Sequence, residues 1–577
     1  MKTTTTTTAS ARPARRRTRS RALVRGVAAA LALGPLASAG CGGTTSAAGG
    51  PGSTLAGPVV TVAPSTTAHR GGSVVYGLEA ESDGLDTATN RWSVSSFELG
   101  NAVYDPLTAM GADGLAHPYL AEYLAPNVDF TEWTIKLRPG ITFHDGTPLN
   151  AEALIKNLAW VRRSPLTGGA LTLLDPDTPA VKVDDLTVKV PLRGPWAQFP
   201  VAMTGQVGFI EAPSQIDTAD AGTRGHHPVG TGPFTFQEWK VDSQFTAKRN
   251  DHYWRTDERG QSLPYLESVT FRPITDTRSR SGALKAGDID LMSVSTPDLA
   301  TEFAELADQG RFQIARDPGQ QEKFFLMFNL GAAPTDDLRL RQAVAYGIDV
   351  RNVLSAQGAD DSWRADSIFS KSTPWYTDTH YPAFDPARAK RLVDEYEAEH
   401  GPLTLHLQTT TIPDDQRGAQ VVQAELATIG IDVVIESSEL ATLITKALTG
   451  TYEVAYWRQF GDVDPDSQYL WWTSANANEP GEGRLALNMA RVKDPVIDQA
   501  LDEARRTNDA TSRRARYAKV AQRMTDLLPY VWLQDSVKFV FAAPKVRDFL
   551  NGPLPDGGQA LSLATGTHRL THTWIDA

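Results

Sequence analysis

Two segments in the first third of the chain have the pattern of a strand. Residues 133–138 read Trp-Thr-Ile-Lys-Leu-Arg, a period of two that predicts a strand with one buried face. Residues 73–76 have the same strand-like character. Asn150 precedes apolar residues at helical spacing, so we predict a helix that begins after an Asn150 cap.

Strands and helices alternate regularly in the second half. Asp385-Pro386 supplies an N-cap and a first-turn proline, and Gly401-Pro402 ends the helix that follows. The apolar pattern then predicts, in order, a strand over 403–407, a helix ending at Gly430, a strand over 431–435, a helix over 440–448, a strand over 452–457, two more helices, and a strand near 537–541. This order favours a parallel sheet covered on both faces, whose ligands lie outside the carboxyl ends of the strands.

The first forty residues have the pattern of an export signal. Eight basic residues and no acidic residue precede Cys41, and the apolar run 27–36 is about half of the ~20 residues that a membrane-spanning helix needs. Residues 36–41 resemble the lipobox of bacterial lipoproteins, although Ser38 stands where leucine is usual. We therefore expect residues 1–40 to be a signal peptide and Cys41 to be lipidated, anchoring the protein to the outer face of the cytoplasmic membrane. A soluble secreted protein cut nearby is the alternative, and the export route, general secretory or twin-arginine, stays open.

Charge and cysteine content narrow the function classes. Without the eight basic residues of the signal, 48 basic and 68 acidic residues remain, a formal charge of −20. That charge argues against binding to nucleic acid and against electrostatic docking on membranes. One cysteine cannot form an internal disulfide. Residues 41–69 contain no Lys, Arg, Asp or Glu and are rich in Gly, Ser, Thr and Ala, so we expect a flexible tether.

Several motifs together resemble one protein family. Residues 137–152, Leu-Arg-Pro-Gly-Ile-Thr-Phe-His-Asp-Gly-Thr-Pro-Leu-Asn-Ala-Glu, are similar to the signature of the extracellular solute-binding proteins of family 5, the receptors of ABC importers for peptides, opines and nickel. Further matches follow in the family's order at 229–234, 250–254, 286–290, 328–329, 337–343, 348–349 and 462–465. Because they occur in order over nearly the whole mature chain, a chance match is improbable.

The resemblance implies an α/β clamshell of two lobes, with an enlarged first lobe and mixed sheets flanked by helices. Lobe one would span 70–323 and continue in 535–577, and lobe two would span 324–534. The implied function is to capture a solute between the lobes, an oligopeptide or a similar zwitterionic or cationic molecule, and to deliver it to the permease and ATPase subunits. We expect a monomer without enzymatic activity, cofactor or metal.

The resemblance also suggests ligand-binding residues. In peptide-binding relatives, the first aspartate of a motif like 462–465 pairs with the α-ammonium of the ligand, which assigns that role to Asp462. A turn-forming role for the aspartates around Pro465 is the alternative. Some peptide receptors have an arginine six residues earlier, where this chain has Tyr456, and Arg458 lies two residues further on. Flat rings that could stack on a ligand are expected at Trp92, Trp457 and Trp471.

Other functions have weaker support. His144-Asp145 is interpreted as part of the turn that the family motif builds, and His226-His227 as an exposed loop pair rather than a nickel site. The chain has no serine-nucleophile elbow, phosphate-binding glycine loop or zinc-protease helix, so a hydrolase on this scaffold is disfavoured. A lipoprotein that hands its solute to a signalling system, or a receptor for a nickel chelate or an oligosaccharide, stays as an alternative.

Overall fold

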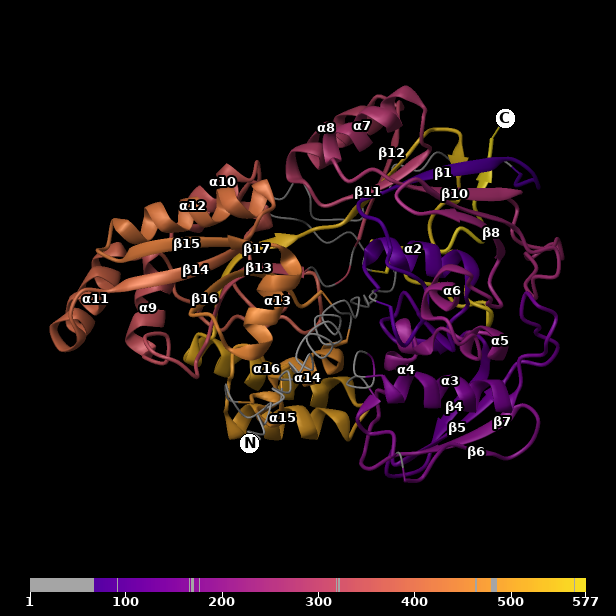
Figure 1. Ribbon diagram of the computed structural model, residues 1–577, viewed down its shortest axis with the longest axis horizontal. Helices are drawn as coiled ribbons and strands as arrows, with labels where there is room; N and C mark the ends of the chain where they lie inside the picture. Colours follow the sequence, from indigo (N-terminus) through magenta and orange to yellow (C-terminus); the bar gives the residue numbers. More distant parts are fainter. Residues whose placement is uncertain are drawn as a thin grey trace, which may run out of the picture.

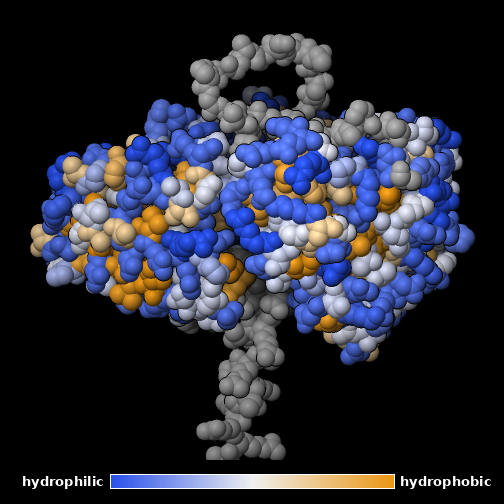
Figure 2. All heavy atoms as spheres, turned by 90° about the horizontal axis from the view of Figure 1, so that it is seen from above, coloured by the Kyte–Doolittle hydropathy of each residue, from blue (hydrophilic) through white to orange (hydrophobic). Residues whose placement is uncertain are grey.

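The computed structural model describes residues 67–576, apart from 91, 165–166, 168–170, 176, 318, 320–321, 462–463, 479–484 and 565. The predicted signal peptide, Cys41 and most of the tether over 41–69 lie outside the described residues. In the part that is described, none of the helices combines the length and apolar character needed to cross a membrane. Figure 1 shows two lobes side by side, and Figure 2 shows a mostly hydrophilic face with scattered apolar patches.

Lobe one is built on a seven-stranded sheet. Its strands, in spatial order, are β12 (Gln313–Arg316), β18 (Phe539–Ala542), β11 (Leu291–Val294), β1 (Ser73–Leu78), β10 (Ser268–Pro273), β9 (Gln244–Arg249) and β8 (Phe234–Lys240). Strand β1 pairs in parallel with β10 and β11, whereas the other pairs are antiparallel. The associated helices are α2 (Val94–Val103), α7 (Thr277–Ala286) and α8 (Pro297–Asp308). The predicted strand at 73–76 is therefore confirmed as β1.

A four-stranded antiparallel sheet enlarges lobe one. Its order is β4 (Ala121–Pro126), β5 (Glu132–Leu137), β7 (Thr187–Pro191) and β6 (Val181–Lys182). Around it lie α3 (Ala151–Arg163), α4 (Phe199–Ala202), α5 (Pro213–Ile216), α6 (Ala221–His226) and the short strand pair β2 (Thr108–Met110) with β3 (Ala116–Pro118). The pair β19 (Val546–Arg547) with β20 (Trp574–Ile575) packs instead with the core of the seven-stranded sheet. The predicted strand at 133–138 and the helix after Asn150 are both confirmed, and the Asn150 side chain accepts a hydrogen bond from the Ala153 amide at 3.0 Å.

Lobe two contains a five-stranded sheet, ordered β15 (Asp432–Ser438), β14 (Thr404–Thr410), β16 (Val454–Gln459), β13 (Glu322–Phe328) and β17 (Tyr530–Ser536). Strands β14, β15 and β16 are parallel, as their alternation with helices predicts. Strands β13 and β17 join them antiparallel, so the sheet is mixed. The helices are α9 (Leu338–Gly347), α10 (Val350–Ala356), α11 (Pro386–His400), α12 (Pro413–Ala427), α13 (Leu440–Thr449), α14 (Tyr469–Trp472), α15 (Pro495–Arg505) and α16 (Ala510–Leu527).

Both faces of the lobe-two sheet are buried. Alternate side chains of β13 enter two different cores: Leu326 packs with residues of α9, α10, α11 and α12, and Phe325 packs with residues of α13, α15 and α16. A sheet covered on both faces needs apolar residues at successive strand positions, which explains the continuous apolar run Phe324–Phe328. Figure 1 shows α12 and α14–α16 on opposite sides of this sheet.

The chain passes between the two large sheets twice. It leaves lobe one after β12 and enters lobe two at β13, and it returns from β17 to β18 through only two residues, Val537 and Lys538. The first core of lobe two continues into lobe one through apolar residues that include Val537 and Phe539. The two lobes therefore share a hinge in which both crossing segments lie next to each other.

Candidate functional site

The carboxyl ends of the parallel strands in both lobes face the hinge. In lobe one, the last residue of β11, Val294, pairs with Phe539, the first residue of β18. In lobe two, the first residue of β13, Glu322, pairs with Ser536, the last residue of β17. Because β18 and β13 begin where the chain has just crossed, the two carboxyl edges meet at the crossing segments. Open α/β sheets bind ligands at this edge, so the space between the lobes is the candidate site.

A cluster of charged side chains occupies the hinge end of this space. Glu322 Oε2 lies 3.5 Å from Arg458 Nε and 3.6 Å from Lys538 Nζ. Glu79 follows β1 directly, at the carboxyl edge of lobe one. The positive charge of Lys538, together with Arg458 and Arg280, holds the pKa of Glu79 below its usual value although burial opposes the shift. The cluster therefore joins residues of both lobes.

The same cations act on Glu322. Burial alone would raise its pKa, but Arg458 and Lys538 more than offset this effect, and the pKa of Glu322 lies below its usual value. Glu322 in turn raises the pKa of Arg458. The side chain of Arg458 is 40% exposed, compared with 18% for Glu322 and 7% for Lys538. Arg458 is thus the member of this cluster that a solute entering from solvent meets most readily.

Buried ionic contacts also hold the crossing segments. The Lys323 ammonium contacts Asp535 and Ser370. Asp317 accepts hydrogen bonds from the Gly319 amide at 2.8 Å and from the Gly566 amide at 2.7 Å, and burial raises its pKa to about 6. These contacts lie within or beside the segments 317–323 and 535–538, so they define the geometry of the hinge.

A second contact joins the lobes away from the crossing segments. The Trp196 indole donates a 2.7 Å hydrogen bond to Asp466 Oδ2, and Arg505 Nε donates to Oδ1 of the same carboxylate at 2.7 Å. Next to it, the Ala197 amide donates to the Arg505 carbonyl at 2.8 Å. The side-chain amide of Gln198 donates to the Thr507 carbonyl at 3.0 Å. Trp196 follows β7 of lobe one and Asp466 follows β16 of lobe two, so we call this set the Trp196 contact.

Four of the predicted ligand-binding residues lie in the cores, Trp92 and Tyr456 among them. Trp92 is 0% exposed and packs against Phe97, Tyr104 and Phe209 within lobe one. Tyr456 is 3% exposed, and a Cβ placed on Gly418 would lie only 2.4 Å from its hydroxyl oxygen. In this conformation both side chains are packing residues, because neither presents a surface to the space between the lobes.

The other predicted residues are placed as follows. Trp457 is 6% exposed and Trp471 is 5% exposed, both in the second core of lobe two, and the Trp457 indole donates to Gln459 Oε1 at 3.0 Å. Arg458 belongs to the hinge cluster, as described above. Asp462 lies outside the described residues. Its ligand role stays a prediction.

The aspartates that follow Asp462 are structural. Asp464 caps the 3-10 turn Pro465–Gln468 by accepting from the Asp466 amide at 2.9 Å, and Arg513 Nη1 donates to Asp464 at 2.7 Å. Asp466 pairs with Arg505. The turn-forming interpretation is therefore confirmed for Asp464, whereas the Asp466 carboxylate binds Arg505 and Trp196 instead of capping the turn.

Sequence patterns alone did not single out Glu79, Glu322 and Lys538. Their common signal is modest: each is a charged residue at the end of, or directly beside, a predominantly apolar strand. Such positions are frequent in any α/β protein, so only the topology, which brings the crossing segments beside β1, distinguishes these three from other charged residues.

His144 lies in the predicted turn, whereas His226 is the last residue of α6 and is only partly exposed, so the interpretation of His226-His227 as an exposed loop pair is wrong for His226. His144 is part of the turn, where Nε2 contacts the Gly232 carbonyl at 3.0 Å, and burial lowers the pKa of His144 to about 4. His226 and His227 contact backbone carbonyls of their own short helix, at Gly222 and Thr223. Across the described ranges, no group of three His, Cys, Asp or Glu side chains is arranged to hold a metal ion.

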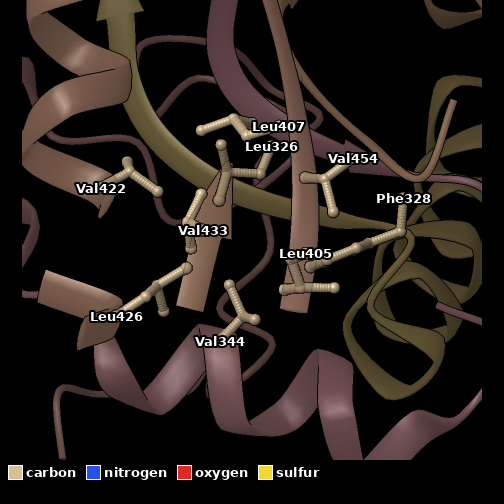
Figure 3. A pocket seen from close by; sticks show the side chains of 9 residues that line it. All are labelled: Leu326, Phe328, Val344, Leu405, Leu407, Val422, Leu426, Val433 and Val454. Atoms are coloured by element: carbon tan, nitrogen blue, oxygen red, sulfur yellow. The ribbon is translucent and has the colours of Figure 1, made fainter. Parts of the chain in front are cut away.

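A small apolar space in lobe two is separate from the candidate site. Figure 3 shows the nine side chains around it, which come from both the sheet and the helices of the first core: Leu326, Phe328, Val344, Leu405, Leu407, Val422, Leu426, Val433 and Val454. All nine are buried core residues and none is polar. This space is an imperfection in packing beneath the sheet, without the polar groups that orient a solute.

Two α/β lobes joined by two crossing segments form the clamshell fold of the periplasmic binding proteins. Residues 116–481 match the family model of the bacterial extracellular solute-binding proteins, family 5. The chain belongs to this family, whose members serve as extracytoplasmic receptors of ABC importers and are not enzymes. The family assignment made from the sequence motifs is therefore confirmed.

Curated relatives and solved structures agree with this assignment. The chain is 25% identical to the nickel-binding periplasmic protein of Escherichia coli over 468 residues, covering 78% of this chain and 87% of the relative. It is 25% identical to the dipeptide-binding protein of the same organism over 528 residues, covering 86% and 94%. Among solved structures, DppA of Helicobacter pylori in complex with the peptide STSA is similar, with a TM-score of 0.73, 23% identity, and coverage of 88% and 99%.

Proposed function

We propose that this receptor captures an oligopeptide, or a similar zwitterionic or cationic solute, between its lobes and delivers it to the permease and ATPase subunits of an importer. The observation that carries the proposal is the hinge cluster, where Arg458, Lys538, Glu79 and Glu322 present both signs of charge at the carboxyl edges of the two sheets. A zwitterion needs partners of both signs when it leaves water. A solute that touches both lobes favours the closed form.

Asp462 is the proposed partner of the cationic group of the solute. In the sequence it stands three positions after the last residue of β16, in the motif 462–465 that resembles the corresponding segment of peptide-binding relatives. Its carboxylate would pair with an ammonium group brought by the solute. Asp462→Ala should weaken an amine-bearing ligand severalfold or more. Asp394→Ala, which changes an exposed aspartate on α11, serves as the matched control, and unchanged affinity in Asp462→Ala would refute the assigned role.

Isothermal titration of the mature protein tests the solute class. Pools of short peptides, opines, oligosaccharides and nickel chelates are titrated separately into protein that has been unfolded and refolded to remove any copurified solute. We expect the peptide pool to give heat of binding. When the pool is divided and each fraction is titrated, the heat should come from a single tightly bound peptide. Absence of binding in the peptide pool, together with binding in another pool, would overturn the peptide assignment while leaving the receptor role intact.

A nickel chelate is the second candidate. The relative with 25% identity over 468 residues is named a nickel-binding periplasmic protein. In a chelate the metal is already surrounded by organic ligands, so the receptor would recognise the carboxylates of the chelator with cations such as Arg458. Competition between the nickel-chelate pool and the peptide pool for one site would show whether both solutes use the same space.

We propose further that a lipid anchor on Cys41 holds the monomeric receptor at the outer face of the cytoplasmic membrane. The support is the position of the one cysteine at the end of the predicted signal peptide. Stable attachment takes more than one acyl chain, as lipoproteins carry. Growth with labelled palmitate should label the wild-type protein, and Cys41→Ser should abolish the label and release the protein from the membrane fraction. Equal label in both would contradict the anchor.

A further inference from the structure

We propose that Lys538 and Arg458 form a subsite for a single carboxylate group of the solute at the hinge end of the interlobe space. The inference rests on the proposed function only in that a solute enters this space. It adds the chemical group that the hinge recognises and the residues that recognise it.

The ammonium group of Lys538 is buried without hydrogen bonds. The residue is 5% exposed, and Nζ has no hydrogen-bond partner among the described residues. Its nearest carboxylate oxygen, Glu322 Oε2, is 3.6 Å away, which is beyond hydrogen-bond length for a charged pair. An ammonium has three N–H groups, and leaving them unfilled in a buried position is costly. Such a group is therefore prepared for an acceptor that arrives with the solute.

The Lys538 side chain is held in place by its surroundings. A Cβ on Gly566 would approach the Lys538 Cβ to 2.8 Å, so the backbone at Gly566 packs directly on the lysine stem. The ammonium points toward Glu322, whose same oxygen faces Arg458. The two cations thus converge from the hinge and from β16 on one point.

Arg458 supplies the second half of the subsite. Its guanidinium lies 5.7 Å from the centre of the Phe324 ring, and its Nε is 3.5 Å from Glu322. With 40% of the side chain exposed, Arg458 is accessible to a solute from the solvent. A planar guanidinium matches the two oxygens of a carboxylate, and an adjacent ammonium adds a third donor.

The neighbouring carboxylates select the charge of the ligand. Glu79 and Glu322 lie beside the two cations, Asp415 also attracts Arg458, and Arg280 adds a further positive charge near Glu79. These carboxylates raise the pKa of Arg458, and the nearest of them leaves the Lys538 donors unfilled. Their negative charge also opposes a dianion such as phosphate, which makes a monoanionic carboxylate the ligand group of best fit.

Matched acids and amides test the subsite. Wild-type protein and the variants Lys538→Met, Lys538→Arg and Arg458→Gln are titrated with a short-peptide pool as free acids and with the same pool as C-terminal amides. A set of non-peptide monocarboxylates and their amides is titrated in parallel. Lys390→Met, at an exposed lysine of α11, is the control, and thermal unfolding of every variant reports whether it is folded.

We expect wild type to bind acids at least tenfold more tightly than amides, and Lys538→Met to reduce this ratio to near one. Lys538→Arg should recover part of the ratio, Arg458→Gln should lower it, and Lys390→Met should leave it unchanged. If Lys538→Met fails to fold, the ratio of acid to amide affinity in Arg458→Gln and Lys538→Arg tests the subsite instead. A ratio near one in wild type, a ratio that no folded variant changes, or no binding of any carboxylate overturns the subsite. If only non-peptide carboxylates bind, with dependence on Lys538, the subsite stands and the peptide assignment fails.

Discussion

Two buried aspartates of lobe two are paired with arginines of other elements. Asp464 and Asp466 follow β16, and their arginine partners lie on α16 and α15. Asp464 raises the pKa of Arg513, although burial of the guanidinium opposes this effect. Such pairs add little to stability by comparison with apolar residues, but loss of one partner leaves the other charge buried and unpaired.

Asp464→Asn should therefore be strongly destabilising. Asp464 is 4% exposed and Arg513 is 6% exposed, so the substitution leaves a buried guanidinium without its counter-ion. We expect a loss of about 3 to 5 kcal/mol in the free energy of unfolding, measured by urea denaturation. Asp394→Asn, which removes the exposed partner of Lys390, should cost less than about 1 kcal/mol. Equal losses in the two variants would contradict the argument.

A buried pair in lobe one makes stability depend on pH. His568 Nδ1 lies 3.5 Å from Glu98 Oε1, and both side chains are almost fully buried. Burial raises the pKa of Glu98 well above its usual 4.5 and lowers the pKa of His568 from 6.5 to about 3. In the folded protein the pair thus holds one proton from about pH 3 upward until Glu98 ionises.

The unfolded pair holds two protons below pH 4.5, one between 4.5 and 6.5, and none above 6.5. Stability falls with decreasing pH below 4.5, because the unfolded state then binds more protons than the folded state. It falls with increasing pH above 6.5, because the unfolded state then binds fewer. Each limb has a slope of up to about 1.4 kcal/mol per pH unit. The result is the same whichever residue holds the folded-state proton.

The double variant Glu98→Gln, His568→Gln isolates this contribution from other titrating groups. The difference in unfolding free energy between wild type and the double variant, from urea denaturation at each pH, should be largest between pH 4.5 and 6.5 and decline on both sides. A difference that does not change between pH 3.5 and 8 would show that the pair does not titrate as the burial of its members requires.

At the scale of elements, helix ends follow their local sequence closely. Helix α11 begins after Asp385, whose side chain accepts from the Arg388 amide at 2.9 Å, and it ends at Gly401, which has a φ of 85°. Only glycine adopts that backbone conformation without strain. Local signals of this kind explain why predicted boundaries at Asn150, Asp385 and Gly401 agree with the structure.

Asp385→Ala tests the capping interaction. The substitution removes the acceptor for the first-turn amide of α11 and should lower the free energy of unfolding by about 1 kcal/mol in urea denaturation. Asp385→Asn keeps an acceptor oxygen and should restore most of that stability. Equal stability of the alanine and asparagine variants would mean that the cap does not contribute.

At the scale of the whole molecule, the interlobe space lies between the hinge and the Trp196 contact. The hinge carries the charged cluster, and the Trp196 contact joins the same lobes through Asp466 and Arg505. Closure around a solute would involve both regions, since the hinge positions the lobes and the Trp196 contact holds them together. Opening therefore requires the Trp196 contact to break.

Trp196→Phe should shift the ligand-free protein toward the open form. The phenyl ring keeps much of the apolar packing but cannot donate to Asp466, and loss of about 1 kcal/mol changes the ratio of closed to open molecules about fivefold. Small-angle X-ray scattering should give a larger radius of gyration than for wild type, with the difference removed at saturating solute. Trp160→Phe is the matched control, because its indole donates to Asp86 within lobe one. Identical scattering for wild type and Trp196→Phe would contradict a closing role.

The sequence by itself determined the elements that depend on neighbours along the chain, and with them the class of protein. The period-two segment at 133–138, the caps of α3 and α11 and the strand–helix alternation after Gly401 all arise from interactions within a few residues, so a linear pattern reveals them. The ordered family motifs identified the receptor family for the same reason, because each motif is a short local segment.

Only the tertiary structure decided which side chains face the space between the lobes. Trp92 and Tyr456 have the residue types of ligand contacts but are buried by distant segments, whereas Glu79, Glu322 and Lys538 are drawn together although hundreds of residues separate the first from the last. Burial and charge pairing depend on contacts made after the chain crosses the hinge twice, and no periodicity along the sequence encodes those contacts.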